Sequence, residues 1–313
     1  MAPSSSGPLR TGVTVSDGTT IAVTEFGAAG RVARLAEPDR GTRGTGPRDS
    51  RGVPDRGTQG IGSRDSRTIL LLHGLMGRAS TWWSHSRWLA DFGRVVGVDA
   101  RGHGDSPASG PWRTERFVAD LVEVVEALEL APVTVIGHSM GGLHGWELAA
   151  LRPDLVSALV VEDMAPDHRG RTPDDWTAWF AAMPAAFASV AAVRDAFGHP
   201  RASAGEYLAE CVREGPDGYR LLTDPEEAGR IAAEWGRRDF WPGVRAVRCP
   251  TLLLQAEESP IAGEQMPLMA SAMTDARHVL VPGTGHLLHD DAPDEFRRLV
   301  TDFLTGVNGT GAR

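Results

Sequence analysis

The sequence predicts an α/β protein with a mostly parallel, doubly wound sheet, and two observations support this prediction. From Thr68 onward, short apolar segments of strand type alternate with segments whose apolar residues recur at helical spacing. This alternation is typical of a parallel sheet with helices on both faces. Within it, a Gly-x-Ser-x-Gly turn at 137–141 separates an apolar, β-branched run from a helix-forming segment. A sharp strand-to-helix turn of this kind exposes the hydroxyl of its central serine.

The expected strands and helices can be placed in order along the chain. Segments 11–15 and 19–26 alternate in hydropathy around Ser16-Asp17-Gly18 and predict an N-terminal hairpin. Further strands are expected at 68–72, 94–98, 133–136, 156–161, 251–254 and 279–281. An amphipathic helix before strand 133–136 has its apolar face at Phe117, Leu121, Val124, Val125 and Leu128. The last helix has its apolar face at Phe296, Leu299, Val300, Phe303 and Leu304.

Two segments break this pattern. Residues 38–51 recur as residues 54–67 with eleven of fourteen positions identical, and neither copy has enough apolar residues to bury a core. We therefore predict a disordered, duplicated, Arg- and Gly-rich insertion over 30–67. Residues 164–248 are rich in alanine and tryptophan and predict a helical insertion, after which the core resumes over 249–305. The ends, 1–10 and 306–313, are expected to be disordered tails.

Charge and composition exclude several classes of protein. The formal net charge of −9 argues against a surface that binds nucleic acid. No apolar run approaches the length of a membrane span, and the N-terminal residues lack the charged and apolar regions of a signal peptide. The only cysteines, Cys211 and Cys249, form no disulfide framework and lack metal-ligand spacing, so a cytoplasmic location is expected. The expected partner is a small-molecule substrate, and the oligomeric state is left open.

Two residues have the chemistry of a serine hydrolase. Ser139 is the expected nucleophile, because it lies at the centre of the strand-to-helix turn. A serine hydroxyl is a poor nucleophile until a base takes its proton and an acid orients that base. His286 is the expected base, since it follows strand 279–281 in a Gly-Thr-Gly-His loop. His289, three residues later, is expected at the surface.

Three further motifs accompany this turn: His73-Gly74 after strand 68–72, the loop Asp99-Ala100-Arg101-Gly102-His103-Gly104-Asp105-Ser106, and the Gly-Thr-Gly-His loop at 283–286. With them the chain resembles the α/β-hydrolase fold superfamily, in its serine esterase-like branch, from Thr11 to Leu304. The resemblance implies that 164–248 forms a helical cap between the sixth and seventh core strands. It also implies an oxyanion hole from the backbone N–H groups of Leu75 and Met140, and neither cofactor nor metal.

The acid departs from the usual pattern of this superfamily. Relatives usually have Gly-x-x-Asp after the strand that corresponds to 251–254, whereas this chain has Ser259 at the aspartate position. Asp163, which ends the preceding strand, is the favoured acid, because some hydrolases of this fold take their acid from there. Glu258 or Glu257 is the alternative. Each choice preserves the order serine, acid, histidine.

The expected function is cleavage of a carboxylic ester of a small to medium apolar substrate, through an acyl-enzyme on Ser139. A hydrolase of C–C bonds in diketones or a thioesterase would use the same three residues and stays an alternative. A non-catalytic ligand-binding protein on the same fold is an alternative of another class, favoured by the missing aspartate at position 259.

Overall fold

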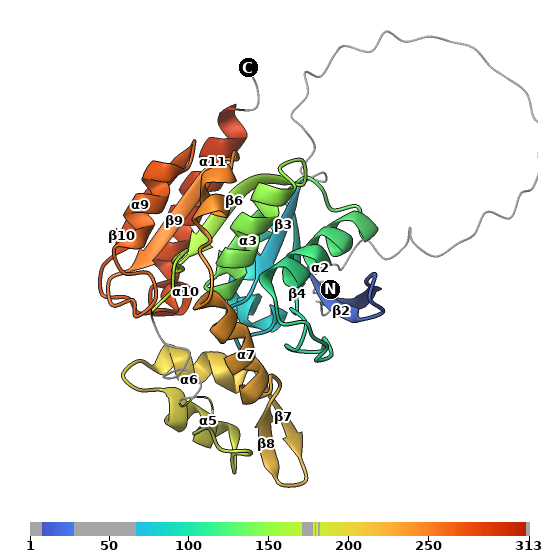
Figure 1. Cartoon of the computed structure of the whole chain (residues 1–313). Helices are drawn as coiled ribbons and strands as arrows, with labels where there is room; N and C mark the ends of the chain where they lie inside the picture. The colour runs from blue at the N-terminus through green and yellow to red at the C-terminus, as the bar shows by residue number, and fades with distance from the viewer. Residues whose placement is uncertain (1–7, 28–66, 171–177, 179, 181, 311–313) are drawn as a thin grey trace, which may run out of the picture.

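The computed structural model describes residues 8–27, 67–170, 178, 180 and 182–310 (Figure 1). Its strands are β1 (Leu9–Thr14), β2 (Thr20–Phe26), β3 (Thr68–Leu72), β4 (Arg94–Val98), β5 (Val133–His138), β6 (Val156–Glu162), β7 (Val212–Gly215), β8 (Gly218–Leu221), β9 (Thr251–Ala256) and β10 (Ala276–Val281). Its helices are the 3-10 helix η3 (Ala79–Trp82) and α1 (Trp83–Leu89), α2 (Thr114–Ala127), α3 (Met140–Leu151), α5 (Val190–Phe197), α6 (Ala202–Ala209), α7 (Pro225–Trp235), α8 (Trp241–Ala246), α9 (Gln265–Ala272), α10 (Leu288–Asp291) and α11 (Pro293–Thr310).

A sheet of eight strands forms the centre of the molecule, in the order β1-β2-β4-β3-β5-β6-β9-β10. Strand β2 pairs antiparallel with β1 and β4, and all later neighbours pair parallel. This is the mostly parallel, doubly wound sheet that the sequence predicts. Strand β10 starts at Ala276, before the expected residue 279. The sequence did not indicate this start, because the first residues of the strand are exposed or half-exposed and lack the continuous apolar run of a buried strand.

Both faces of the sheet are covered by helices, as the apolar residues of β3 illustrate. Leu70 and Leu72 belong to a buried cluster that also contains apolar residues of α2 and α3. Ile69 and Leu71 point to the opposite face, into a second cluster with apolar residues of α1 and α11. Successive residues of a strand alternate between the two faces of a sheet, so a continuous apolar run such as β3 fits a strand buried on both sides.

Most of the described chain between β6 and β9 forms a separate layer beyond one end of the sheet (Figure 1). In Figure 1, α5, α6, α7 and the hairpin of β7 and β8 lie together there, whereas α8 packs against α3 and α9. The prediction of a wholly helical segment was wrong at this hairpin, in which Arg213 pairs with Arg220. The overlooked signal is Pro216-Asp217-Gly218, a turn sequence whose glycine has φ +113°.

The predicted tails are longer than the structure allows. Leu9 and Arg10 already belong to β1, where they pair with Glu25 and Thr24 of β2. At the other end, α11 continues to Thr310, since extending an existing helix needs no new nucleus. The duplicated insertion at 30–67, apart from Arg67, and residues 1–7 and 311–313 of the tails lie outside the described residues.

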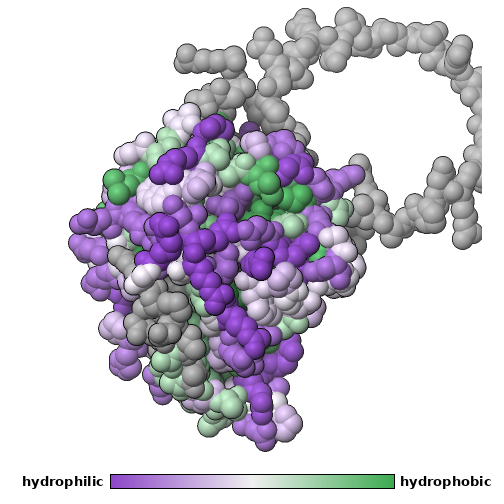
Figure 2. Space-filling model, in the orientation of Figure 1, coloured by the Kyte–Doolittle hydropathy of each residue, from purple (hydrophilic) through white to green (hydrophobic). Residues whose placement is uncertain are grey.

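The surface seen in Figure 2 is mainly hydrophilic, and its hydrophobic residues lie in small separate patches. The large apolar side chains exposed in the described residues are Leu9, Trp83, Leu151, Leu268 and Leu280. They belong to different elements, and isolated exposed apolar residues are common on folded proteins. Among the described helices, none is both long and apolar enough to cross a membrane.

A cluster of three glutamates around Arg238 joins helix α3 to the segment after α7. Arg238 Nη2 lies 3.8 Å from Glu147 Oε2, and Arg238 Nη1 lies 3.6 Å from Glu234 Oε1 and also contacts Glu115. Thr114 donates a hydrogen bond to Glu234 at 2.6 Å. Burial raises the pKa of Glu147 to about 7, although the positive charge of Arg238 opposes this effect.

We expect Glu147→Gln to raise the free energy of unfolding at pH 8 by about 1–3 kcal/mol and to change it little at pH 4. Between an unfolded pKa of 4.5 and a folded pKa of about 7, the folded wild type keeps a proton that the unfolded chain has released. Wild-type stability therefore falls as pH rises through this window. Urea unfolding at pH 4, 6 and 8 measures the difference, with Glu126→Gln at an exposed position as the control. A gain that is constant with pH would contradict the prediction.

Candidate active site

The predicted nucleophile lies at a tight turn between β5 and α3. Ser139 has φ 51° and ψ −118°, a backbone conformation that is strained for a residue with a side chain. The two flanking glycines make the turn possible. A Cβ atom at Gly137 would lie 2.3 Å from the carbonyl oxygen of Gly141, and one at Gly141 would lie 2.3 Å from that of Leu72. The Gly-x-Ser-x-Gly motif therefore has a steric origin.

His286, in the loop after β10, bridges Ser139 and Asp163. Its Nε2 lies 3.0 Å from Ser139 Oγ, and its Nδ1 lies 2.7 Å from Asp163 Oδ2. A carboxylate only accepts hydrogen bonds, so Nδ1 carries the proton of the neutral ring and Nε2 is free to accept from the serine hydroxyl. This is the arrangement in which an imidazole can act as a general base toward serine.

Asp163 follows β6, and its side chain is fully buried. Three groups donate to its carboxylate: His286 Nδ1, the backbone N–H of Ala256 at 3.1 Å, and Ser259 Oγ at 2.7 Å. A buried carboxylate is stable when its oxygens are hydrogen-bonded in this way. Ser259, which occupies the usual position of the acid, thus donates a hydrogen bond to Asp163, the predicted acid, which follows the neighbouring strand.

Each of the two alternative acids has a partner other than His286. Glu258 is exposed and forms an ion pair with Arg201 at 2.7 Å. Glu257 is also exposed and accepts a hydrogen bond from the backbone N–H of Gly283 at 2.8 Å. Both glutamates contact groups around the loop that holds His286. The structure therefore brings Ser139, His286 and Asp163 together and leaves Glu257 and Glu258 outside this cluster.

The two residues expected to form the oxyanion hole lie at the start of α3 and in the turn after β3. Met140 is the first residue of α3, where backbone N–H groups and the helix dipole favour negative charge. Leu75 lies in the turn after β3, which is closed by a hydrogen bond of 3.0 Å from Gly77 N to Gly74 O. Their part in stabilising an oxyanion stays a prediction.

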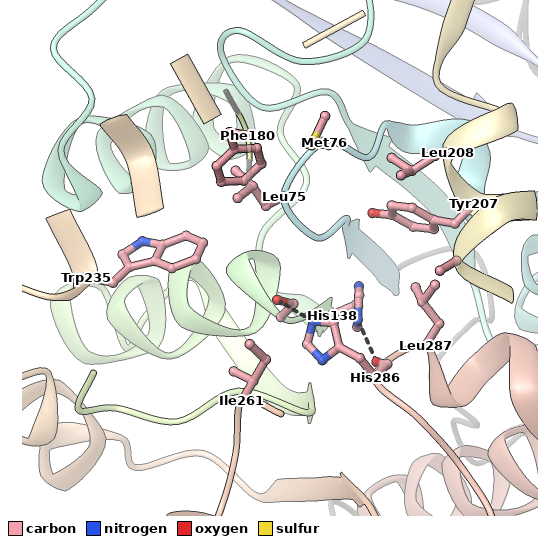
Figure 3. A pocket seen from close by; sticks show the side chains of 12 residues that line it. Leu75, Met76, His138, Phe180, Tyr207, Leu208, Trp235, Ile261, His286 and Leu287 are labelled. Carbon is pink, nitrogen blue, oxygen red and sulfur yellow. Dashed lines mark hydrogen bonds between the residues drawn. The ribbon is translucent and has the colours of Figure 1, made fainter. Parts of the chain in front are cut away.

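A cavity of about 470 Å³ opens over Ser139 and His286. Its lining residues are Leu75, Met76, His138, Ser139, Phe180, Ala204, Tyr207, Leu208, Trp235, Ile261, His286 and Leu287. Figure 3 shows Trp235 and Phe180 on one side of this space and Tyr207 and Leu208 on the other. Among the described residues, this lining contains no Asp, Glu, Arg or Lys side chain. In the described part of the chain, no group of three His, Cys, Asp or Glu side chains could hold a metal ion.

The model of a protein family described as "Alpha/beta hydrolase family" matches residues 69–299. The chain belongs to this family. The resemblance inferred from the sequence motifs is thereby confirmed, and so is the fold.

Several proteins that are similar to this α/β-hydrolase are named as lipases, esterases or other hydrolases. The sn-1-specific diacylglycerol lipase ABHD11 of Mus musculus is 32% identical over 253 residues, which cover 75% of this chain and 80% of the relative. Esterase YbfF of Escherichia coli (strain K12) is 29% identical over 245 residues, which cover 75% and 92%. The solved structure of E-2-(acetamidomethylene)succinate hydrolase has a TM-score of 0.75 and 21% identity, and covers 95% of this chain and 99% of its own.

The chain is accordingly an enzyme, an α/β-hydrolase of the carboxylesterase-like type. This sets aside the alternative of a non-catalytic binding protein on the same fold.

Sequence reasoning missed several residues of this hydrolase's site. The contact of Ser259 with Asp163 gave no sequence signal, because the two residues are far apart in the chain. Tyr207 and Leu208 of α6 had a weak signal, since Ala204, Tyr207 and Leu208 share one helix face. The expectation for His289 was wrong. It is fully buried, and its Nδ1 lies 2.8 Å from Glu162 Oε1.

Proposed function

We propose that this α/β-hydrolase is a cofactor-free serine esterase that cleaves carboxylic esters of small to medium apolar substrates. The observation that supports this most strongly is the continuous series of hydrogen bonds from Ser139 through His286 to Asp163, at the wall of an apolar cavity. We take Ser139 as the nucleophile, His286 as the base and Asp163 as the acid.

The reaction follows from these positions. Ser139 Oγ attacks the ester carbonyl carbon while His286 Nε2 takes the hydroxyl proton, and Asp163 stabilises the imidazolium that forms. The backbone N–H groups of Leu75 and Met140 bind the oxyanion. His286 then returns the proton to the leaving alcohol, which leaves an acyl group on Ser139. Water, activated by the same histidine, releases the acid and restores the serine.

The lining of the cavity supports an uncharged substrate. A carboxylate or ammonium group in this space would lose its hydration, and the described lining residues include no Asp, Glu, Arg or Lys to pair with it. Apolar groups gain free energy from contact with Phe180, Leu208 and Trp235. We further propose that the segment over 164–248 acts as the cap of this site, because it contributes these three side chains.

Two other proposals concern the setting of the enzyme. Cys211 and Cys249 are both free thiols, which supports the cytoplasm, where thiols stay reduced. The net charge of −9 and the apolar cavity support a small-molecule substrate as the partner, in preference to nucleic acid.

The same three residues could also hydrolyse a thioester or the C–C bond of a diketone. Both reactions need an activated serine and an oxyanion hole, so the catalytic residues do not distinguish them from ester hydrolysis. The substrates that the protein cleaves do distinguish them. Turnover of matched esters, thioesters and diketones by the purified protein decides among them.

The first test is the intact mass of the protein after exposure to a fluorophosphonate probe. We expect one adduct, formed on an activated Ser139, and no adduct on the Ser139→Ala variant. Turnover of p-nitrophenyl esters of increasing acyl length should also disappear in this variant. A folded wild type that forms no adduct and cleaves no ester would contradict the proposed function, as would labelling that survives Ser139→Ala.

A further inference from the structure

His138, the last residue of β5, contacts the backbone of the residue proposed as the base. Its side chain is buried, and its Nε2 lies 2.9 Å from the carbonyl oxygen of His286. The centroids of the two rings are 4.7 Å apart. Figure 3 shows this hydrogen bond as a dashed line beside the one between His286 and Ser139. His138 is also adjacent to Ser139 in the chain, so one residue touches both sides of the proposed proton transfer.

The direction of this hydrogen bond defines the tautomer of His138. A carbonyl oxygen only accepts, so His138 Nε2 must carry the hydrogen and donate it. The other nitrogen, Nδ1, is buried and has no hydrogen-bond partner among the described residues. A hydrogen there would be an unsatisfied buried donor. Burial, reinforced by the positive charge of a protonated His286, also lowers the pKa of His138 well below 6.5, so the ring is neutral.

Packing prevents the His138 ring from leaving this position. A Cβ atom on Gly74 would lie 2.5 Å from His138 Nδ1, so the ring lies directly against the turn that leads to Leu75. On the other side, Tyr207 of α6 meets the ring edge-on at a centroid distance of 6.0 Å. The ring is thus wedged between the turn of the expected oxyanion hole and the loop of His286.

The ring of His286 contacts Ser139 and Asp163, and two further contacts hold neighbours of His286 in the same part of the chain. Gly285 N donates to Asp291 Oδ2 at 2.6 Å, and His289 pairs with Glu162. His138 holds the carbonyl of His286 directly, and that carbonyl belongs to the residue whose ring must face both Ser139 and Asp163.

We propose that His138 is a positioning residue of the reaction: its Nε2–H group, through the His286 carbonyl, holds the His286 ring in line with Ser139 and Asp163. This inference rests on the proposed function. It assigns a role to the residue next to the nucleophile that neither the sequence motif nor the family match supplies. An error of about 1 Å in the placement of a reacting group can reduce the rate about 100-fold, which sets the scale of the effect.

The test compares His138→Leu, which removes the donor, with His138→Gln, whose amide N–H can reach the same carbonyl. We expect His138→Leu to lower kcat for an apolar ester and the rate of fluorophosphonate labelling by about 10- to 100-fold, with KM within about twofold. His138→Gln should restore most of both rates. His144→Leu is the matched control, because His144 is an equally buried histidine on α3 that packs against Phe117. A thermal melt verifies that each variant is folded.

A second measurement needs neither a variant nor a substrate. The ¹⁵N chemical shifts of the imidazole nitrogen atoms in the wild type should show His138 protonated at Nε2 and bare at Nδ1. The opposite tautomer would overturn the inference, and so would a folded His138→Leu variant with wild-type kcat or equal losses in the Leu and Gln variants. A wild type that is inactive toward both probe and ester would overturn the proposed function itself.

Discussion

Asp163→Asn should lower kcat/KM for ester hydrolysis by about three to four orders of magnitude. An asparagine has nearly the shape of the aspartate, but it has no charge to stabilise the imidazolium of His286. Its amide NH₂ can also donate to His286 Nδ1, which would place the ring hydrogen on Nε2 and leave no acceptor for the serine proton. Steady-state kinetics with a p-nitrophenyl ester, with protein folding verified by a thermal melt, measures this loss.

The matched controls for this experiment are Glu258→Gln and Glu257→Gln, which remove the two alternative acids. Each should stay within a few-fold of wild type, because Glu258 pairs with Arg201 and Glu257 binds the backbone of Gly283, both away from the His286 ring. The reverse ranking, with a glutamate variant inactive and Asp163→Asn active, would show that the acid is one of these glutamates.

Asp120→Ala should lower the free energy of unfolding by about 3–5 kcal/mol. Arg101 is fully buried, and its Nε and Nη2 atoms each lie 2.7 Å from a carboxylate oxygen of Asp120 on α2. Arg116 Nη2 binds the same carboxylate at 2.7 Å. Removing Asp120 takes the two-point partner from a buried guanidinium, which keeps the half-exposed Asp17 at 3.0 Å, and leaves Arg116 beside it as a second positive charge. This costs far more than a lost surface contact. Urea denaturation gives this difference.

Asp154→Ala is the control for this prediction. Asp154 also binds an arginine, Arg152, at 2.6 Å, but the aspartate side chain is 60% exposed. Exposed ion pairs contribute only about 0–1 kcal/mol, so the two substitutions should differ by several kcal/mol. Equal effects would mean that the Arg101 pair is not the buried contact described here.

The strands and the expected nucleophile and base were predicted from the sequence because local signals determine them. A short apolar run such as 68–72, followed by a His-Gly turn, is typical of a strand buried on both faces. The glycines beside Ser139 are required because a Cβ atom at either position would lie 2.3 Å from a nearby carbonyl oxygen. The need for glycine at Gly137 and Gly141 can therefore be inferred from the five residues of the motif itself. The hairpin of β7 and β8 was missed because its strands are short and half-exposed, although its Pro-Asp-Gly turn is visible.

The sequence favoured Asp163 as the acid but left Glu258 and Glu257 open, because an acid needs only to meet the histidine in space. Asp163 and Glu258 both follow strands of the sheet, but Asp163 is fully buried against His286 and Glu258 is 60% exposed. Similarly, the burial of His289 follows from its pairing with Glu162, which is 127 positions away in the chain. Neither contact has a local sequence pattern.

The sequence by itself determined the alternation of strands and helices, the serine turn and the histidine loop, since each depends on backbone sterics and hydropathy within a few residues. Only the tertiary structure decided that Asp163 faces His286, that Ser259 supports it, and that His138 holds the His286 carbonyl. Those contacts join residues from different strands and loops, and their partners come within hydrogen-bond distance only when the parallel sheet brings the carboxyl ends of its strands to one edge.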